Sequence, residues 1–220
     1  MTIHLLRHGK TLANEKKLYC GHTDLPLSEN GKLELIALKS QNIYPSAADI
    51  FFTSGLIRTG QTLDILYGQS ENKAASVHLS GGSQDITPHE TCAFLQRRTA
   101  VPAIAEYNFG QFEMKSYEDL KEQDDYQAWI TDETGDVPCP GGESKNQVQK
   151  RVMEGYFHIT EVMRQAGHKS AIVACHGGTI VSIMEHLFPN TKNFYEWQPQ
   201  PGRGYSLTYT GDGQCIYNPL

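Results

Sequence analysis

An arginine and a histidine follow directly after a short apolar run at the start of the chain. Three of the four residues in Ile3–Leu6 are apolar, and Arg7-His8-Gly9 come next, which predicts a buried strand that ends in a sharp loop. A neutral imidazole is a nucleophile near pH 7, and a guanidinium offers a fixed fork of donors to phosphate oxygens. Taken alone, Arg7-His8-Gly9 also fits a strand end with incidental charges. Whether suitable partner residues occur elsewhere in the chain decides between this interpretation and a catalytic one.

Two further apolar runs end near residues of the same chemistry. Ala171–Cys175 has no polar alternation, which predicts a strand buried on both faces, and His176-Gly177 follow it directly. Ile50–Thr53 predicts another buried strand, with Arg58 just inside the next helix, although Arg58 alone also fits a solvated helix position. Ligands bind at the carboxyl ends of the strands in open α/β sheets, and a helix N-terminus there adds N–H groups for an anion. These residues are therefore expected to meet.

Brought together, these side chains match phosphoryl transfer through a phosphohistidine. His8 is the expected nucleophile, with a proton held on Nδ1 by a backbone carbonyl and Nε2 available to attack. Arg7, Arg58 and His176 would neutralise the oxygens of the transferring group. Glu106, in an irregular segment that contains glycine, would protonate the leaving oxygen and then deprotonate the attacking water.

Strand and helix patterns alternate along most of the chain. Helices are predicted over 29–41 with Ser28 as the N-cap, over 56–66, from Ser116 with Asp119 at capping-box spacing, over 144–166 with Ser144 as the N-cap, and over 180–187. Their apolar faces are expected at Leu33, Ile36, Ala37 and Leu38, at Leu120, Tyr126, Trp129 and Ile130, and at Val148, Val152, Tyr156, Ile159 and Met163. Further strand candidates are 205–209 and 215–217. The order predicts an α/β fold with a mainly parallel central sheet and helices on both faces.

Residues 68–102 differ from the rest of the chain. Small and polar residues dominate there, turn signals recur, and only Cys92–Arg98 has the pattern of a short helix. A long stretch of this kind inside a compact domain is usually functional or disordered. The chain is therefore expected to form one domain over residues 1–220, with an insertion or lid at about 68–102 over the active-site face.

Composition argues against several partners. The 220 residues carry a net charge of −6 without a basic block, so nucleic acid is not expected. No apolar run approaches the length of a membrane span, and the N-terminus lacks a basic-then-apolar signal, so no membrane is expected either. Five scattered cysteines form no CxxC pair, and no Asp/His cluster suggests a metal. The expectation is a cytoplasmic protein with reduced thiols and with no metal or other cofactor.

Six motifs, in this order, resemble those of the histidine phosphatase superfamily, from Leu5 to about Thr191 with the insertion excepted. They are Leu6-Arg7-His8-Gly9-Lys10-Thr11 with Asn14, Gly21-His22-Thr23-Asp24-Leu25-Pro26-Leu27-Ser28 with Gly31, Thr53-Ser54-Gly55-Leu56-Ile57-Arg58-Thr59 with Gln61-Thr62, Glu106 with Gly110 and Glu113, Pro140-Gly141-Gly142-Glu143-Ser144, and Cys175-His176-Gly177-Gly178. The resemblance implies a phosphoglycerate-mutase-like three-layer sandwich.

The resemblance also implies roles for individual residues. The implied catalytic set is His8, Glu106, His176, Arg7 and Arg58, and phosphate or substrate contacts are implied at Asn14, Cys20, Gly21 and Gly177. Three positions depart from the family pattern. Lys10 replaces the usual Glu or Gln, Cys20 stands where Ser or Thr is common, and Gly60 stands where a helix former is expected. None of these departures removes a catalytic group; the roles of Lys10 and His22 stay open, between the mouth of the site and the solvent.

Within the superfamily, the sequence favours hydrolysis over phosphoryl transfer to a second substrate. Related mutases carry extra basic residues after the Glu106 segment, whereas residues 114–125 are largely acidic here. The runs 109–129 and 138–143 resemble α-ribazole phosphatases, and also broad-specificity members. The expected activity is metal-independent hydrolysis of a small phosphorylated metabolite, with α-ribazole 5'-phosphate as a candidate. The alternatives are a cofactor-dependent phosphoglycerate mutase and a non-catalytic module that binds a phospho-ligand; the oligomeric state is open, with a homodimer among the options.

Overall fold

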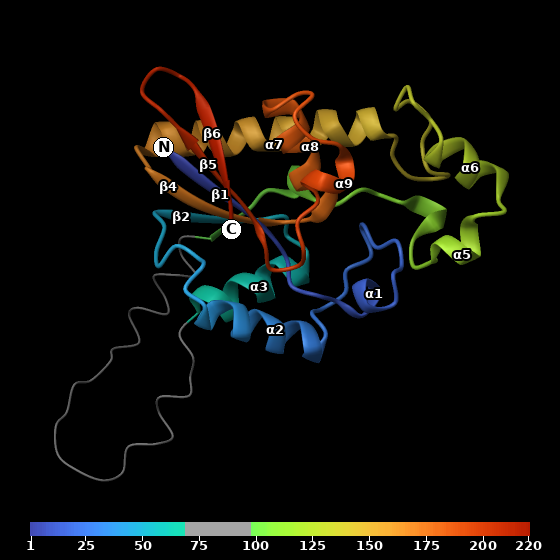
Figure 1. Cartoon of the computed structure of the whole chain (residues 1–220), viewed down its shortest axis with the longest axis horizontal. Coiled ribbons are helices and arrows are strands. Elements are labelled where there is room, and N and C mark those ends of the chain that lie inside the picture. Colours follow the sequence, from blue (N-terminus) through green and yellow to red (C-terminus); the bar gives the residue numbers. More distant parts are fainter. Residues whose placement is uncertain (69–97) are drawn as a thin grey trace, which may run out of the picture.

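The structure is a computed structural model that describes residues 1–68 and 98–220 (Figure 1). The strands in this part of the chain are β1 (Thr2–Arg7), β2 (Ile50–Thr53), β3 (Arg98–Ala100), β4 (Ser170–Cys175), β5 (Gly204–Tyr209) and β6 (Cys215–Pro219). The α-helices are α1 (Leu12–Glu15), α2 (Glu29–Ser40), α3 (Ile57–Tyr67), α5 (Tyr117–Leu120), α6 (Asp124–Ile130), α7 (Lys145–Ala166), α8 (Gly177–Leu187) and α9 (Phe194–Trp197). Two short 3₁₀ helices are η2 (Pro102–Ile104) and η3 (Gly110–Phe112).

The strands form one sheet in the order β3-β2-β4-β1-β5-β6. Strands β1 to β4 run parallel, and the β5–β6 hairpin is antiparallel, as predicted for a mainly parallel sheet. Strand β4 lies between β1 and β2, and Arg7 is paired with Cys175. The next residues, His8 and His176, therefore leave the sheet side by side, and β2 ends with Thr53 at the same edge.

Helices cover both faces of the sheet, which confirms the three-layer architecture (Figure 1). Helices α7 and α8 lie on one face, and α2 and α3 lie on the other. In β4, Ala171, Val173 and Cys175 pack into the core under α7 and α8, whereas Ile172 and Ala174 pack into the core under α2 and α3. Because both faces of this strand are buried, its sequence has no polar alternation.

The long helix α7 begins where the sequence predicts. The Ser144 side chain accepts from the backbone N–H of Gln147, and the Gln147 side chain accepts from the backbone N–H of Ser144, which together form a capping box. The helix ends at Gly167, whose φ of 69° suits a left-handed C-cap. The predicted apolar stripe from Val148 to Met163 is buried, so α7 is a rigid support along one face of the sheet.

Helix α2 turns a different face to the core from the one predicted. Its buried residues are Gly31 and Leu35, whereas Leu33 and Ile36 are 64% and 54% exposed. A Cβ at Gly31 would clash with the backbone of Lys10, so only a glycine permits this close approach. That approach fixes the rotation of the helix, which apolar spacing alone left open.

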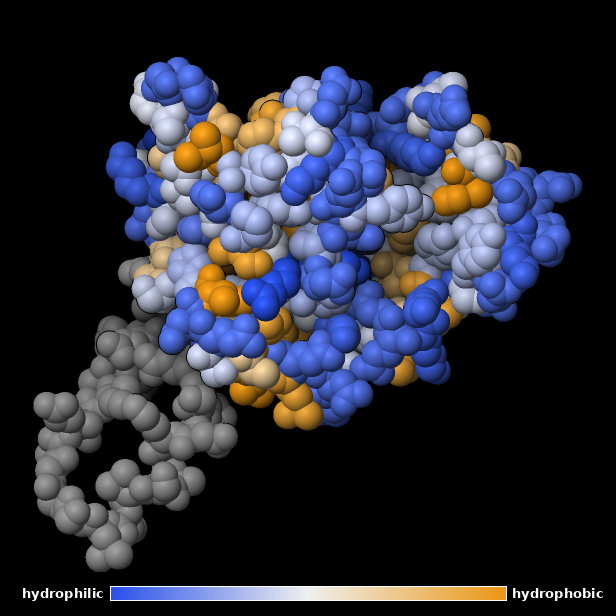
Figure 2. Space-filling model, viewed as in Figure 1, coloured by the Kyte–Doolittle hydropathy of each residue, from blue (hydrophilic) through white to orange (hydrophobic). Residues whose placement is uncertain are grey.

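On the face drawn in Figure 2, the exposed apolar patches are small and separated by hydrophilic residues.

The region after Ser116 forms two short helices, not one. The predicted capping box with Asp119 is present, but α5 ends at Leu120 and α6 begins at Asp124. Leu120, Tyr126 and Trp129 form a small core of their own with Phe112 and Cys139, whereas Ile130 is 37% exposed. These helices lie apart from the two main layers, beyond the ends of α7 and α1 (Figure 1).

The end of the predicted insertion belongs to the sheet. Residues Arg98–Ala100 form β3, which pairs with β2 in parallel, and η2 follows. Three residues are too few to show a period of two, so sequence patterning did not separate them from the preceding loop. Residues 69–97 of the predicted insertion, which include most of the predicted helix Cys92–Arg98, lie outside the described residues. In the described ranges, no helix has both the length and the apolar character that a bilayer crossing requires.

Candidate active site

The imidazoles of His8 and His176 meet at the carboxyl edge of the sheet. The backbone N–H of His8 donates to the carbonyl of Cys175 at 3.0 Å and so extends the pairing of β1 with β4 by one residue. The two ring centroids lie 5.1 Å apart, with ring planes inclined at 64°. Both side chains are buried. The structure thus brings together the two histidines that the sequence placed at separate strand ends.

Backbone contact fixes the tautomer of His8. Its Nδ1 lies 2.7 Å from the carbonyl oxygen of Gly9, and because a carbonyl only accepts, Nδ1 carries the hydrogen and Nε2 keeps its lone pair. Burial lowers the pKa of His8 well below its usual value, and the nearby charges of Arg58 and Arg7 lower it further. The ring is therefore neutral at pH 7, with a free lone pair on Nε2.

His176 has the opposite tautomer. Its Nδ1 accepts from Nε of Arg58 at 3.3 Å, so the hydrogen of the neutral ring is on Nε2, which donates to Oγ of Ser54 at 2.8 Å. Burial lowers the pKa of His176 well below its usual value, and the Arg58 charge adds to this effect. The sequence predicted His176 as one of the cations around the phosphate. In the structure its lowered pKa makes the ring neutral at pH 7, and a bound phosphate would favour the protonated form.

Arg58 joins the histidine pair to the loop at residues 21–23. It is 1% exposed in the first turn of α3. Nη1 and Nη2 donate to the carbonyls of Thr23 and Gly21 at 3.0 and 2.6 Å, and Nε donates to His176. The described residues thus take three of the five N–H groups of a guanidinium, which leaves two for an anion.

Arg7 has a buried donor that no described residue satisfies. Its Nη1 donates to the carbonyl of Pro199 at 2.7 Å, but its buried Nε has no partner in the described part of the chain. Burial lowers the pKa of Arg7, and the Glu106 carboxylate opposes that shift. Because a buried donor without an acceptor is destabilising, the unpartnered Nε indicates a site for an oxyanion.

The Glu106 carboxylate is held against the first turn of α8. Its Oε2 accepts from the backbone N–H of Gly178 at 3.1 Å, and its Oε1 accepts from the N–H of Tyr107 at 2.9 Å. The side chain is half-buried, and its negative charge opposes the lowering of the Arg7 pKa by burial. A carboxylate beside the cations but open to solvent can exchange a proton with a leaving group and then with water.

The two glycines expected at the phosphate lie against the arginines. The carbonyl of Gly21 receives Nη2 of Arg58 at 2.6 Å. A Cβ at Gly177 would approach Cζ of Arg7 to 3.2 Å. Both positions therefore help to set the arginine geometry, and direct phosphate contact by these glycines stays a prediction.

Asn14 and Cys20 contact their own loops. The Oδ1 of Asn14 accepts from the N–H and the hydroxyl of Thr11 at 2.9 and 3.0 Å, as part of the cap of α1. The half-buried Cys20 thiol lies 3.5 Å from the carbonyl of Thr23. Burial raises the pKa of Cys20, so its thiol is neutral at pH 7. A substrate contact by either residue stays a prediction.

The other polar side chains near the motifs have separate partners or face solvent. Nζ of Lys10 lies 2.8 Å from a carboxylate oxygen of Glu34 at the surface, as expected for a solvent-facing lysine. His22 is exposed. Nδ1 of His4 lies 2.7 Å from Oγ of Ser206 on the neighbouring strand. Within residues 1–68 and 98–220, no three His, Cys, Asp or Glu side chains are grouped as metal ligands would be, and reaction without a metal stays a prediction.

Glu113 holds the loop that receives Arg58, a role that the sequence did not indicate. Its carboxylate accepts from the backbone N–H groups of Gly21, His22 and Thr23 and from the Thr23 hydroxyl, at 2.7–3.2 Å. The carbonyls of the same loop accept from Arg58. Glu113 was recognisable only as a motif position, because its partners lie about ninety residues away in the chain.

The substitution Glu113→Gln is expected to lower kcat/KM for an aryl phosphate by roughly 10- to 100-fold, as a displaced catalytic group does. An amide directs N–H donors at a loop that itself offers N–H donors, so the carbonyls that hold Arg58 would shift. Steady-state kinetics measure the effect. Glu118→Gln on α5 is the control, because Glu118 only pairs with Lys121 at the surface. Equal activity of the two variants would contradict the role of Glu113.

Stability is expected to fall in acid because two histidines are buried in neutral form. The unfolded chain protonates both rings below about pH 6.5, whereas the lowered pKa values of His8 and His176 keep the folded rings neutral to lower pH. The unfolded state then binds more protons, so the free energy of unfolding decreases by up to about 1.4 kcal/mol for each ring per unit by which the pH falls.

Urea unfolding from about pH 7.5 to about pH 5 measures this slope. His8→Gln should remove one ring's share, and His158→Gln, at an exposed site, should not; identical slopes in the two variants would refute the assignment.

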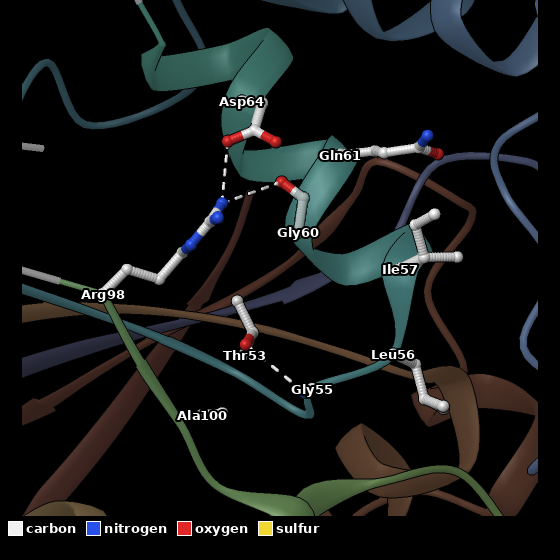
Figure 3. A pocket seen from close by; sticks show the side chains of 9 residues that line it. All are labelled: Thr53, Gly55, Leu56, Ile57, Gly60, Gln61, Asp64, Arg98 and Ala100. Atoms are coloured by element: carbon white, nitrogen blue, oxygen red, sulfur yellow. Dashed lines mark hydrogen bonds and ion pairs between the residues drawn. The ribbon is translucent and has the colours of Figure 1, made fainter. Parts of the chain in front are cut away.

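A separate cavity of about 350 Å³ lies between α3 and β3 (Figure 3). It is lined by Thr53, Gly55, Leu56, Ile57, Gly60, Gln61, Asp64, Arg98 and Ala100. Arg98 donates to Asp64 at 2.7 Å within it. Among these described lining residues, none belongs to the predicted catalytic set, so this cavity is not the phosphate site.

A mainly parallel sheet that brings two buried neutral histidines and two arginines to one edge defines an α/β protein suited to phosphate chemistry. The family model of the histidine phosphatase superfamily (branch 1) matches residues 3–79 and 89–217. The chain therefore belongs to the histidine phosphatase superfamily, as its motifs indicate. The match omits residues 80–88, inside the stretch where the sequence predicts an insertion.

Curated relatives of the chain include mutases. The 2,3-bisphosphoglycerate-dependent phosphoglycerate mutase 1 of Arabidopsis thaliana is 27% identical over 190 residues, which are 83% of this chain and 56% of that protein. The phosphoglycerate mutase of Protochlamydia amoebophila is 29% identical over 191 residues and 83% of both chains. The chain thus spans little more than half the length of the plant relative.

Solved structures with the same fold include phosphatases and a mutase. A putative alpha-ribazole-5'-P phosphatase from Escherichia coli superposes with a TM-score of 0.76 at 20% identity, covering 100% of this chain and 95% of that one. A phosphoglycerate mutase from Thermus thermophilus gives a TM-score of 0.63 at 23% identity, covering 100% and 98%. At these identities the likeness establishes the fold.

Proposed function

We propose that the protein is a phosphomonoester hydrolase that acts through a phosphohistidine on His8. The fixed tautomer of His8 carries this proposal: its Nε2 keeps a lone pair in a buried site beside Arg58 and the unpartnered Nε of Arg7. A buried neutral imidazole that faces two guanidiniums is suited to attack on a phosphate that those guanidiniums bind.

The proposed reaction has two displacements. Nε2 of His8 attacks phosphorus, the bond from phosphorus to the leaving oxygen breaks, and Glu106 gives that oxygen its proton. Glu106 then takes a proton from water, whose oxygen attacks phosphorus and breaks the N–P bond, which releases inorganic phosphate and neutral His8. Arg7, Arg58 and a protonated His176 stabilise the charge on the phosphoryl oxygens in both steps.

A phosphoglycerate mutase is the second candidate, favoured by the names of the curated relatives. A mutase must also hold the second acidic group of its substrate, for which basic side chains are needed near the mouth. Of the two lysines in residues 114–125, Lys121 is already paired with Glu118 at 2.7 Å. The shortage of unpaired cations in this segment supports hydrolysis over transfer.

The proposed substrate is a small phosphorylated metabolite, with α-ribazole 5'-phosphate as the first compound to test. Its support is the resemblance of residues 109–129 and 138–143 to α-ribazole phosphatases, together with a shared fold. The same proposal places this soluble phosphomonoesterase in the cytoplasm. It requires no metal and binds neither nucleic acid nor a membrane.

Phosphate release from an aryl phosphate in the presence of EDTA tests the proposal. Turnover under these conditions supports a metal-independent hydrolase, and binding of inorganic phosphate without turnover would indicate a phospho-ligand binding module. With 3-phosphoglycerate as substrate and 2,3-bisphosphoglycerate present, formation of 2-phosphoglycerate in excess of free phosphate would indicate the mutase. A panel of phosphorylated metabolites that includes α-ribazole 5'-phosphate then ranks substrates by kcat/KM.

A further inference from the structure

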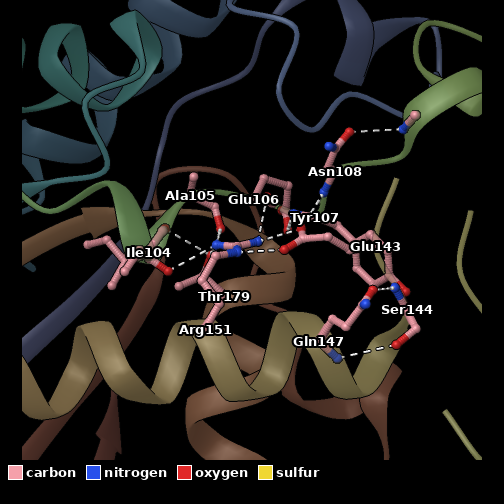
Figure 4. A network of polar contacts seen from close by, with 12 residues as sticks. Ile104, Ala105, Glu106, Tyr107, Asn108, Glu143, Ser144, Gln147, Arg151 and Thr179 are labelled. Carbon is pink, nitrogen blue, oxygen red and sulfur yellow. Dashed lines mark hydrogen bonds and ion pairs between the residues drawn. The ribbon is translucent and has the colours of Figure 1, made fainter. Parts of the chain in front are cut away.

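The segment that carries Glu106 has no regular ladder of helical or sheet hydrogen bonds along its backbone. Residues 105–109 belong to no helix or strand, yet buried carbonyl groups need hydrogen-bond donors. The guanidinium of Arg151, on α7, supplies them: Nη1 donates to the carbonyls of Ala103 and Ala105 at 2.9 and 3.0 Å, and Nη2 donates to that of Glu106 at 3.2 Å. Figure 4 shows the contacts of Arg151 with Ala105 and Glu106. One side chain thus spans the backbone from which the carboxylate projects.

Glu143 fixes the guanidinium of Arg151 in turn. Its two carboxylate oxygens accept from Nε and Nη2 of Arg151, both at 2.7 Å. The same residue pairs with the backbone of Asn108 in both directions, at 2.9 Å each. The pair is largely shielded, with side-chain exposures of 23% and 18%. Such a bidentate pair sets the orientation of the fork, and because Glu143 neutralises it, Arg151 does not act as a further phosphate cation.

Thr179, on α8, supports the same segment from another helix. Its buried hydroxyl lies 3.1 Å from the carbonyl of Ile104 and 3.2 Å from that of Ala105. Helix α8 also provides the N–H of Gly178 that holds the Glu106 carboxylate. The acid/base candidate is therefore bracketed by α7 and α8, two helices that pack on one face of the sheet.

We propose that Arg151 is a positioning residue for Glu106, which keeps the carboxylate within reach of the leaving oxygen. The inference rests on the proposed hydrolase function and on the acid/base role of Glu106 within it. Loss of Arg151 would remove an N–H donor from three backbone carbonyls, although that of Ala105 would still accept from Thr179. The segment could then move, so proton donation would weaken while attack by His8 would continue. Substrates with poor leaving groups need that proton most, so they should lose roughly 10- to 100-fold in kcat/KM, as a misplaced group does, whereas good leaving groups should lose only a few-fold. The ratio kcat/KM is used because it reports the steps up to loss of the leaving group and not the later attack of water, in which Glu106 also takes part.

The experiment compares leaving-group dependence among matched variants. Wild type, Arg151→Met, Glu106→Gln and the double variant are assayed with a series of aryl phosphates of increasing phenol pKa. Both single variants should show a steeper fall of kcat/KM with that pKa, and the double variant should be no steeper than Glu106→Gln. Arg164→Met is the control, because Arg164 lies on the same helix in a bidentate pair with Glu161, at 73% side-chain exposure.

The outcomes separate this inference from the proposed function. If Glu106→Gln steepens the trend and Arg151→Met lowers all substrates equally, Arg151 has only a structural role and the inference is wrong. If Glu106→Gln leaves the trend unchanged, the acid role itself fails, and the inference fails with it. Should Arg151→Met not fold, Arg151→Lys gives the same test, because an ammonium keeps the charge beside Glu143 but lacks the planar fork that reaches three carbonyls.

Discussion

Replacement of His8 by alanine is expected to lower the rate of aryl phosphate hydrolysis by roughly 10⁴- to 10⁶-fold, the loss that removal of an enzymatic nucleophile produces. Nε2 of His8 keeps its lone pair because Nδ1 is bonded to Gly9. His176 offers no substitute nucleophile, since both of its ring nitrogens are hydrogen-bonded, to Arg58 and to Ser54. The measurement is kcat with a fast aryl phosphate.

The matching control is His4→Ala, in β1, the strand that His8 directly follows. His4 contacts Ser206 on β5, away from the carboxyl edge, so this variant should stay within a few-fold of wild type. Wild type quenched during turnover of radiolabelled substrate should carry phosphate that acid releases and base does not, and the His8 variant should carry none. A His8→Ala protein with near wild-type turnover would show that the nucleophile lies elsewhere.

The fold and the meeting of the two histidines at one sheet edge were predictable because local sequence encodes them. An apolar run with no polar alternation identifies a strand buried on two faces, and the residue after it must emerge at the sheet edge. That reasoning placed His8 and His176 together before the pairing of Arg7 with Cys175 was known. The capping box at Ser144 located the start of α7 in the same way, because caps depend on neighbours within one turn.

The supports of the reacting groups were not predictable, because their partners are distant in the chain. Glu113 contacts a loop about ninety residues earlier, Arg151 contacts carbonyls about forty-five residues earlier, and Pro199 receives Arg7 across the whole domain. In each case a charged side chain bonds backbone atoms, which carry no sequence signature. The motifs mark Glu113 and Glu143 as members of a pattern, but only the fold shows what they hold.

Substitution of Arg58 by lysine is expected to lower kcat/KM by roughly 10³-fold, although the positive charge remains. The planar guanidinium donates at once to the carbonyls of Gly21 and Thr23 and to His176, and keeps two N–H groups for the phosphate. An ammonium has three donors from one atom and cannot span these positions. It would leave buried acceptors unsatisfied and the second histidine without its orienting bond.

Arg58→Met removes the charge as well, and should therefore change the pH profile. After burial, the charge of Arg58 is the largest influence that lowers the pKa of His8. Without it the pKa of His8 rises, so protonation inactivates the nucleophile at a higher pH, and the acid limb of kcat/KM should move upward from its wild-type position.

The arginine that serves as the control is Arg98, which also contacts α3, through Gly60 and Asp64. Arg98→Lys should leave both the rate and the acid limb close to wild type. An acid limb in Arg58→Met that coincides with wild type would mean that the charge of Arg58 does not reach His8. A rate for Arg58→Lys near that of Arg98→Lys would mean that charge, and not the fork, is what the phosphate site requires.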